Sequence, residues 1–272
     1  ARRQRQMCIR ESDISMRGTT AWILVCSILI ASVGLNADSI PVVIGAMLIS
    51  PLLGPILGLG LSISINDIDT LKTSIINTLV MVVLSIGAAY IFFLVIPIKE
   101  ESSELLARTN PDVRDVLIAF FGGLALIIAK TKKENISSAI FGVAIATALM
   151  PPLCTVGYYL AENNLTNASG AFLLFLINTL YIIVATYIVL KVLGIPLKVY
   201  ANSKRRKFVN RAVTLIAASF AIIAVLEFFE VMDESKFERE ARSFLDTELV
   251  ALPNGDYLSK SAIIDYNGGE SK

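Results

Sequence analysis

The chain has 272 residues, of which 55% are apolar and only 17% charged; its formal net charge is +1 and its mean hydropathy is +0.69. A typical soluble domain carries about 25% charged residues, so the composition excludes an ordinary soluble protein, and the balanced charge gives no reason to expect nucleic acid as a partner. The absence of histidine excludes catalytic triads, HExxH zinc sites and His-based proton shuttles. We therefore expect no enzymatic activity, metal or cofactor.

Apolar segments follow one another along the chain, at 19–35, 41–64, 70–97, 116–130, 137–160, 169–193 and 208–231. A helix needs roughly 20 apolar residues to cross a bilayer. The second and fifth segments contain Pro and Gly, which interrupt helices. The sequence thus predicts an all-α, multipass transmembrane bundle of about seven spans, with broken second and fifth helices.

Polar segments frame these spans: an N-terminal segment 1–18, a loop 98–115 and a tail 232–272. The start of the tail, 232–249, predicts an amphipathic helix with Phe237, Phe244 and Leu245 on its apolar side. SKSAIIDYNGG, at 259–269, predicts a short strand and a turn. The tail could belong to a small soluble domain, and a start at Ala1 rather than Met would suit a piece of a longer protein.

Lys and Arg are concentrated in 1–18 and between 191 and 211, whereas the loops 36–40 and 161–168 contain none. Cytoplasmic loops are enriched in these residues, so we expect a cell-membrane protein with its N-terminus in the cytoplasm and its tail outside. The region 195–231 holds a basic cluster and the seventh segment. This cluster either fixes the orientation or binds anionic lipid head groups; it consists of Lys204, Arg205, Arg206 and Lys207.

Two stretches of the chain match each other. At a constant offset of 97 residues, Gly45, Pro55, Gly60 and Asn66 align with Gly142, Pro152, Gly157 and Asn163. Each stretch is followed by the tetrapeptide Ile-Asn-Thr-Leu, at 76–79 and 177–180, with an offset of 101. The order of these matches predicts an internal duplication, with a first three-helix repeat at 19–97 and a second at 116–194.

Each repeat crosses the membrane an odd number of times, three. The second copy therefore starts on the opposite side and must be inverted relative to the first. If the interrupted segments are instead re-entrant hairpins, each repeat crosses twice and the repeats are parallel. The charge distribution favours full crossings. Inverted repeats with interrupted helices in matching positions are typical of secondary transporters.

The interrupted segments are the candidate substrate-binding site. Backbone without partners is tolerated in a membrane only against protein or a wet cavity, and freed carbonyls or helix ends can bind ions. Alternatively, the small residues permit close helix packing and the amides join neighbouring helices. The candidate residues supply hydroxyls, amides and irregular backbone: Ser50, Pro51, Gly54, Pro55, Asn77, Thr147, Pro151, Pro152 and Asn178.

No Asp, Glu, Lys or Arg lies in the middle of a predicted span. Carboxylate proton relays, which are typical of proton-coupled pumps, are therefore not expected. A site of hydroxyls, amides and backbone suits a small neutral solute, or an ion held by carbonyls and helix ends.

VVIGAMLISPLLGPI and ALMPPLCTVGYYL carry a resemblance to a known family. Over about 19–195 the chain resembles a prokaryotic family of hydrophobic membrane proteins, domain of unknown function 389. The resemblance implies a multipass membrane protein, and similar members often have a soluble domain attached. It supplies no substrate.

Two hypotheses follow. The first is a transporter or channel-like protein whose site lies where the two breaks meet. The second is a membrane anchor, assembly or sensor module for attached soluble domains. Membrane lipids are the expected partners, and a homo-oligomer stays open.

Overall fold

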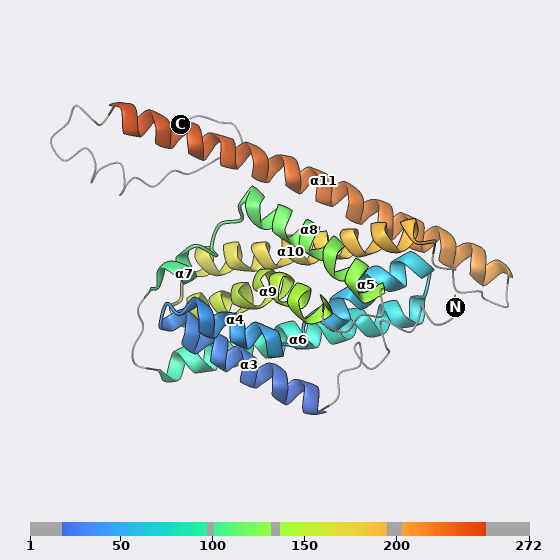
Figure 1. Ribbon diagram of the computed structural model, residues 1–272, viewed down its shortest axis with the longest axis horizontal. Coiled ribbons are helices and arrows are strands. Elements are labelled where there is room, and N and C mark those ends of the chain that lie inside the picture. The colour runs from blue at the N-terminus through green and yellow to red at the C-terminus, as the bar shows by residue number, and fades with distance from the viewer. Residues whose placement is uncertain (1–17, 97–100, 132–136, 195–202, 249–272) are drawn as a thin grey trace. The chain divides into compact units, whose positions relative to one another are not determined.

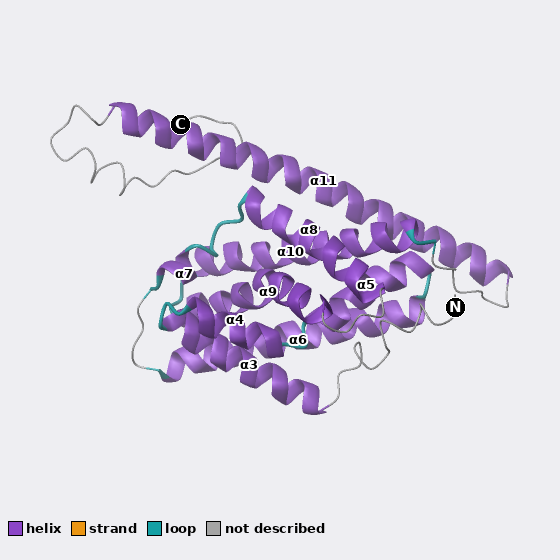
Figure 2. Cartoon of the chain, viewed as in Figure 1, coloured by secondary structure: helices purple, strands orange, loops and turns teal. Residues whose placement is uncertain are grey.

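The computed structural model describes residues 18–96, 101–131, 137–194 and 203–248 (Figure 1). Within these ranges every regular element is a helix (Figure 2), which confirms the all-α prediction. The strand predicted at 259–269 and most of the segment 1–18 lie outside the described residues. The helices, in chain order, are α3 Gly18–Asn36, α4 Ile40–Ile49, α5 Leu53–Ile65, α6 Ile68–Val95, α7 Ser103–Leu106, α8 Val113–Thr131, α9 Ser137–Ala161, α10 Leu165–Val192 and α11 Ser203–Glu248.

The chain divides into two compact units, 1–224 and 225–272. The first unit contains α3 to α10 and the beginning of α11, and the second contains the rest of α11. The predicted seventh segment and the predicted amphipathic helix of the tail are therefore one continuous helix, Ser203–Glu248.

Among the described residues, α3, α6 and α10 are long and apolar enough to cross a membrane, and α4 with α5 forms a bent pair that could be a fourth span. These helices correspond closely to the predicted segments at 19–35, 70–97, 169–193 and 41–64. The segments at 116–130, 137–160 and 208–231 form helices too, in α8, α9 and α11. A membrane location is compatible with these helices, and seven crossings stay a prediction.

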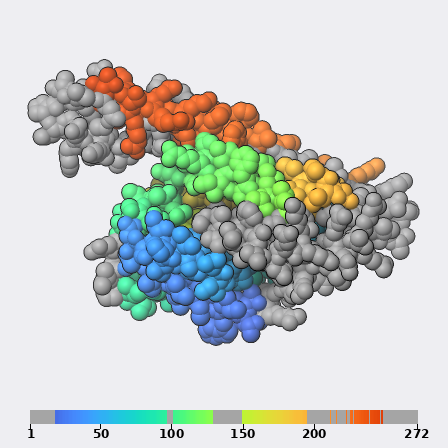
Figure 3. Space-filling view, viewed as in Figure 1, coloured from blue at the N-terminus to red at the C-terminus, as the bar shows by residue number. Residues whose placement is uncertain are grey.

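Helix α9 is the centre of the first unit, because it packs against α3, α4, α5, α6, α8 and α10. Helix α10 packs against α8 and α5, and α6 packs against α3 and α5. Figure 3 shows α3, α4 and α8 forming part of the outer surface of this unit.

The surface and the interior of the first unit have an unusual distribution of side chains. On α6, the side chains of Ile76 and Val83 are 60% and 63% exposed, whereas those of Ser74 and Ser85 are fully buried. The same contrast holds on α10, where Leu176 is exposed and Thr186 is buried. Water would oppose so much exposed apolar surface, whereas hydrocarbon favours apolar surfaces with small and polar residues between helices.

The second predicted span is broken, as expected. Helix α4 ends at Ile49, α5 begins at Leu53, and the two axes differ by 55°. A residue before proline avoids the helical region, and Ser50, which precedes Pro51, is extended with φ −66° and ψ 130°. The local preference of the Ser-Pro pair thus decides where this helix stops.

The predicted break of the fifth helix is wrong. Pro151 and Pro152 lie inside α9, which is one helix from Ser137 to Ala161. Each proline removes a donor from the helix, but both prolines are buried and α9 is surrounded by six helices. Packing on every side holds the helix together, as neighbouring helices do for prolines in membrane proteins.

The matched asparagines form matched turns. Asn66 and Asn163 end α5 and α9 with φ +60° and +55°, the left-handed region that Asn tolerates better than most residues. In both turns the next N–H bonds five residues back, Asp67 to Ser62 O and Asn164 to Tyr159 O, each at 2.9 Å. The same two residues, Asp67 and Asn164, then cap the helices that follow.

These turns define two ends of the bundle, here named the Asn66 end and the Asn163 end. Helix α6 starts at the Asn66 end, and Ala89, near its other terminus, contacts Gly157, close to Asn163. A helix of 28 residues is ~42 Å long. The two turns therefore lie at opposite ends of the bundle.

Candidate functional site

The break between α4 and α5 brings two helix ends together inside the first unit. Ser50 N–H donates to Met47 O at 3.2 Å and Gly54 N–H to Pro51 O at 3.3 Å, while Leu52 N–H reaches Ser50 Oγ at 3.5 Å. The C-terminus of α4 carries a partial negative charge and the N-terminus of α5 a partial positive charge. Such a break can interact with a cation, an anion or a dipolar solute.

The predicted residues of this break are partly accessible. Ser50, Pro51 and Gly54 are half-buried, and Pro55 is buried. Leu52, between them, is only 3% exposed.

The matching residues of the second half lie on α9. Pro151 and Pro152 are buried, and Thr147 is in the helix, although its side chain lies outside the described residues. Because α9 packs against both α4 and α5, the two proline segments belong to neighbouring elements.

The two predicted amides lie on different helices. Asn77 is half-buried on α6, and Asn178 is 1% exposed on α10. In the described part of the chain, α6 and α10 each pack against α5 and α9 but share no extensive contact. Asn178 lies ~20 Å along α10, near its middle, which suits an amide buried deep in a membrane bundle.

The matched glycines make matched crossings between the halves. A Cβ atom at Gly60 of α5 would lie 2.5 Å from Thr186 Cβ of α10, and one at Gly157 of α9 would lie 2.5 Å from Ala89 Cβ of α6. Both positions require glycine because the opposite helix approaches so closely. In each crossing, the second segment of one half packs against the third helix of the other half.

The sequence did not indicate the partners of these glycines. Thr186 lies 101 residues after Ser85, so the offset of the tetrapeptide pairs them, and both hydroxyl side chains are fully buried. Neither oxygen has a hydrogen-bond partner among the described residues. The repeat offset was the signal that could have found this second pair of buried polar groups.

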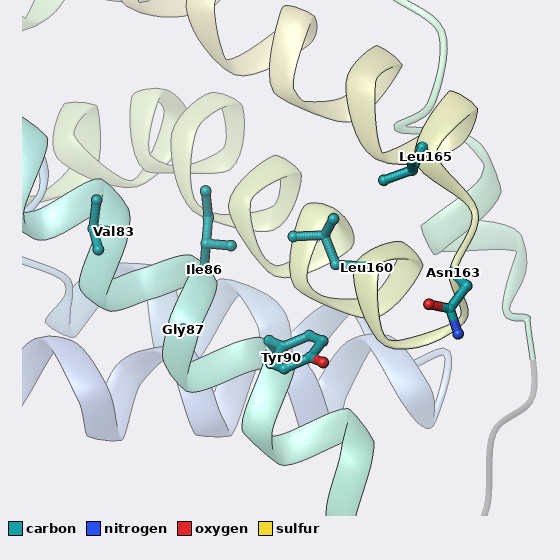
Figure 4. Close-up of a pocket in the computed structure, with 7 residues that line it drawn as sticks. All are labelled: Val83, Ile86, Gly87, Tyr90, Leu160, Asn163 and Leu165. Carbon is teal, nitrogen blue, oxygen red and sulfur yellow. The ribbon is translucent and has the colours of Figure 1, made fainter.

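A groove lies elsewhere in the described part of the chain. Figure 4 shows its lining on α6 and the α9–α10 turn, with Tyr90 and Asn163 presenting polar groups near one end. Its volume is about 590 Å³, and it adjoins a second groove along α6 through the shared Val83. Neither groove contains a predicted site residue, so they do not coincide with the break.

The basic cluster at 204–207 lies in the first turns of α11, and its side chains are outside the described residues. Among the residues that the structure describes, no group of three or more Cys, Asp or Glu side chains could hold a metal ion.

Comparison with known proteins shows the family of this chain. Residues 47–184 match the family described as a domain of unknown function, DUF389. The chain is 31% identical over 209 residues to Uncharacterized protein MJ0678 of Methanocaldococcus jannaschii. The alignment covers 75% of this chain and 63% of that protein, so the chain spans less than two thirds of the relative's length. No solved structure matches the chain.

Proposed function

We propose, from the premise that this chain belongs to the DUF389 family, that it is an integral membrane transporter or channel-like protein for a small neutral solute or an ion. The observation that carries the proposal is the pair of crossings Gly60–Thr186 and Gly157–Ala89. Each joins one half to the other through a glycine that the internal repeat aligns with the glycine of the other crossing.

The directions of the helices support an inverted repeat. Helix α6 runs from the Asn66 end to the Asn163 end, because it starts beside Asn66 and its Ala89 contacts Gly157. Helix α10 starts beside Asn163, and its Thr186 contacts Gly60 near the Asn66 end, so it runs the opposite way. Corresponding helices that run in opposite directions are the arrangement of inverted-topology transporters.

The path of the broken pair supports a full crossing over a re-entrant hairpin. The turn that precedes α4 contacts the loop near the Asn163 end, where Asp38 accepts a hydrogen bond from Ser103 at 3.0 Å. Helix α5 ends at Asn66. The pair of 10 and 13 residues therefore leads from one end of the bundle to the other.

The break supplies the chemistry of the proposed site. It offers the carbonyls at the end of α4, the N–H groups at the start of α5 and the Ser50 hydroxyl. Helix α9, beside it, would add the segment around Pro151, and Thr147 stays a predicted member of the site. With one break rather than two, the site is asymmetric, and we propose that α4 and α5 provide most of its polar groups.

Flux measurements test this function. The purified protein would be reconstituted in liposomes and tested with K⁺, Na⁺ and Cl⁻ by fluorescence and with glycerol and urea by light scattering. We expect flux of at least one probe, reduced at least tenfold in a variant carrying Ser50→Ala, Asn77→Ala, Thr147→Ala and Asn178→Ala. Thr73→Ala, which removes an exposed hydroxyl of α6, is the control. Normal flux in the fourfold variant would show that the site is elsewhere.

A second function is favoured by α11. Its 46 residues form one helix that runs from the predicted apolar segment into the charged tail. Such a helix would suit an anchor, assembly or sensor module for a soluble domain. If no probe crosses the liposomes in any condition, this alternative gains.

We further propose a cell-membrane location with the N-terminus in the cytoplasm and the tail outside. The basic cluster would then lie at the cytoplasmic surface, where anionic head groups attract Lys and Arg. Binding to liposomes with and without phosphatidylserine, compared between the wild type and a Lys204→Ala/Arg205→Ala/Arg206→Ala/Lys207→Ala variant, tests the lipid contact.

A further inference from the structure

The segment 101–112, here named the strap, connects the two halves at the Asn163 end. It is folded by its own contacts: Leu105 N–H donates to Ser102 Oγ at 3.3 Å, and Arg108 forms an ion pair with Glu104 at 3.1 Å. Thr109 Oγ1 donates to Leu106 O at 2.8 Å. The short helix α7 within it is therefore a defined element.

The strap is fastened to the first half at Asp38. This carboxylate accepts Ser103 Oγ at 3.0 Å and Glu104 N–H at 3.3 Å. Asp38 has φ +51° in the turn between α3 and α4, which turns the chain sharply at the end of α3. Helix α7 also packs against α3, and Leu105 is completely buried.

The strap is fastened to the second half at two points. Tyr159 of α9, only 2% exposed, donates its hydroxyl to Glu101 Oε1 at 2.7 Å. Gly170 of α10 faces the carbonyl of Thr109 so closely that a side chain at this position would collide with it. Thr109 itself is 4% exposed.

The strap thus bridges the α3–α9 contact, which is a contact between the halves. Cys154 of α9 is fully buried there, with its Sγ 3.9 Å from Ile28 O of α3. It lies five residues before Tyr159 on the same helix, or ~8 Å along the axis. Movement of α9 away from α3 at this end would expose the thiol.

We propose that the strap is a latch that holds the two halves together at the Asn163 end, and that its release opens the space between α3 and α9. The inference rests on the proposed function, since a transporter with inverted repeats gives access to its site from alternate sides by moving one repeat against the other. The structure then represents the state that is closed at the Asn163 end.

The rate of thiol modification tests the latch without any substrate. In a Cys8→Ser/Cys26→Ser background, Cys154 is the single thiol, and its reaction with N-ethylmaleimide in liposomes can be followed by mass spectrometry. Removing one polar fastening on each half, with Asp38→Gly and Tyr159→Phe, should accelerate the reaction at least tenfold. Glycine accepts the positive φ of residue 38, and phenylalanine keeps the ring of residue 159. Ser169→Ala, which removes an exposed hydroxyl of α10, should leave the rate unchanged.

A second reporter separates local opening from general loosening. In a Cys8→Ser/Cys26→Ser/Cys154→Ser background, Thr186→Cys places a thiol at a buried position near the Asn66 end. It should stay protected when the strap is released. Equal acceleration at both thiols, or no acceleration at Cys154, would overturn the latch. If the double variant does not fold, Tyr159→Phe alone should give a smaller acceleration, and an unchanged rate would be equally decisive.

The latch and transport can fail separately. Faster modification of Cys154 without flux of any probe would support the latch and contradict transport. Flux in the wild type with an unchanged Cys154 rate would contradict the latch alone.

Discussion

The crossing of α5 and α10 at Gly60 gives a sharp quantitative prediction. In Gly60→Ala, the new methyl would lie 2.5 Å from Thr186 Cβ, 2.6 Å from Thr186 Cγ2 and 3.0 Å from Ile183 O. Carbon atoms prefer about 3.5–4.0 Å, so the helices must separate by roughly 1 Å. Overpacking of this kind typically costs about 1–3 kcal/mol, which corresponds to a lower melting temperature by roughly 2–12 °C.

Gly45→Ala is the matched control. Gly45 is also in a helix, but a Cβ there meets nothing within 4 Å. Replacing glycine by alanine in a helix gains about 0.5–1 kcal/mol when there is room, so this variant should melt at the same or a higher temperature. Thermal unfolding in detergent, followed by tryptophan fluorescence or circular dichroism, measures both variants.

A double-mutant cycle connects the loss to the crossing. Thr186→Gly removes the two nearest atoms, so Gly60→Ala should cost at least 1 kcal/mol less in that background, a coupling of the usual size for residues in contact. The counterpart Gly157→Ala should be more harmful, because its Cβ meets the backbone at Tyr90 N, 2.8 Å away. Equal stability of Gly60→Ala and Gly45→Ala would refute the reasoning.

The repeated turns and the prolines give further predictions, all measurable by thermal unfolding. At Asn66 and Asn163, glycine should be tolerated and valine should cost about 1–2 kcal/mol each, because both have positive φ; a harmless valine would contradict that geometry. Asp67→Ala should cost about 1 kcal/mol, and more than Asn164→Ala, because Asp67 caps two N–H groups and Asn164 one; the reverse order would contradict the caps. Pro152→Ala should leave α9 continuous and stabilise the protein by about 1–3 kcal/mol; a lower melting temperature would contradict this. Flux measurements on the same variant show separately whether the proline is needed for function.

The helical segments could be predicted from the sequence because hydropathy depends on local composition. The predicted segment 70–97 became α6, Ile68–Val95, and 19–35 became α3, Gly18–Asn36. The alignment of Asn66 with Asn163 was also informative, since both residues adopt the same left-handed turn. Local signals of this kind act within a few residues and are readable without the fold.

The continuity of α9 could not be predicted, because it depends on neighbours. Pro51 lies in the break between α4 and α5, whereas Pro151 and Pro152 lie inside a continuous helix. The difference arises from the six helices around α9, which tertiary structure alone supplies. The contacts of the strap were equally inaccessible: Asp38 and Ser103 are 65 residues apart, and Tyr159 and Glu101 are 58 apart.

The exchange of partners between the halves has a consequence for how the chain is made. Gly60 meets Thr186, so α5 lacks its partner until a further 126 residues have been synthesised, about 6–25 s at typical rates. During that time the first half is an unfinished assembly, in which the Gly60 surface of α5 has no partner helix. The two halves therefore complete each other, and the contacts of this bundle are all in place only when α10 has been made.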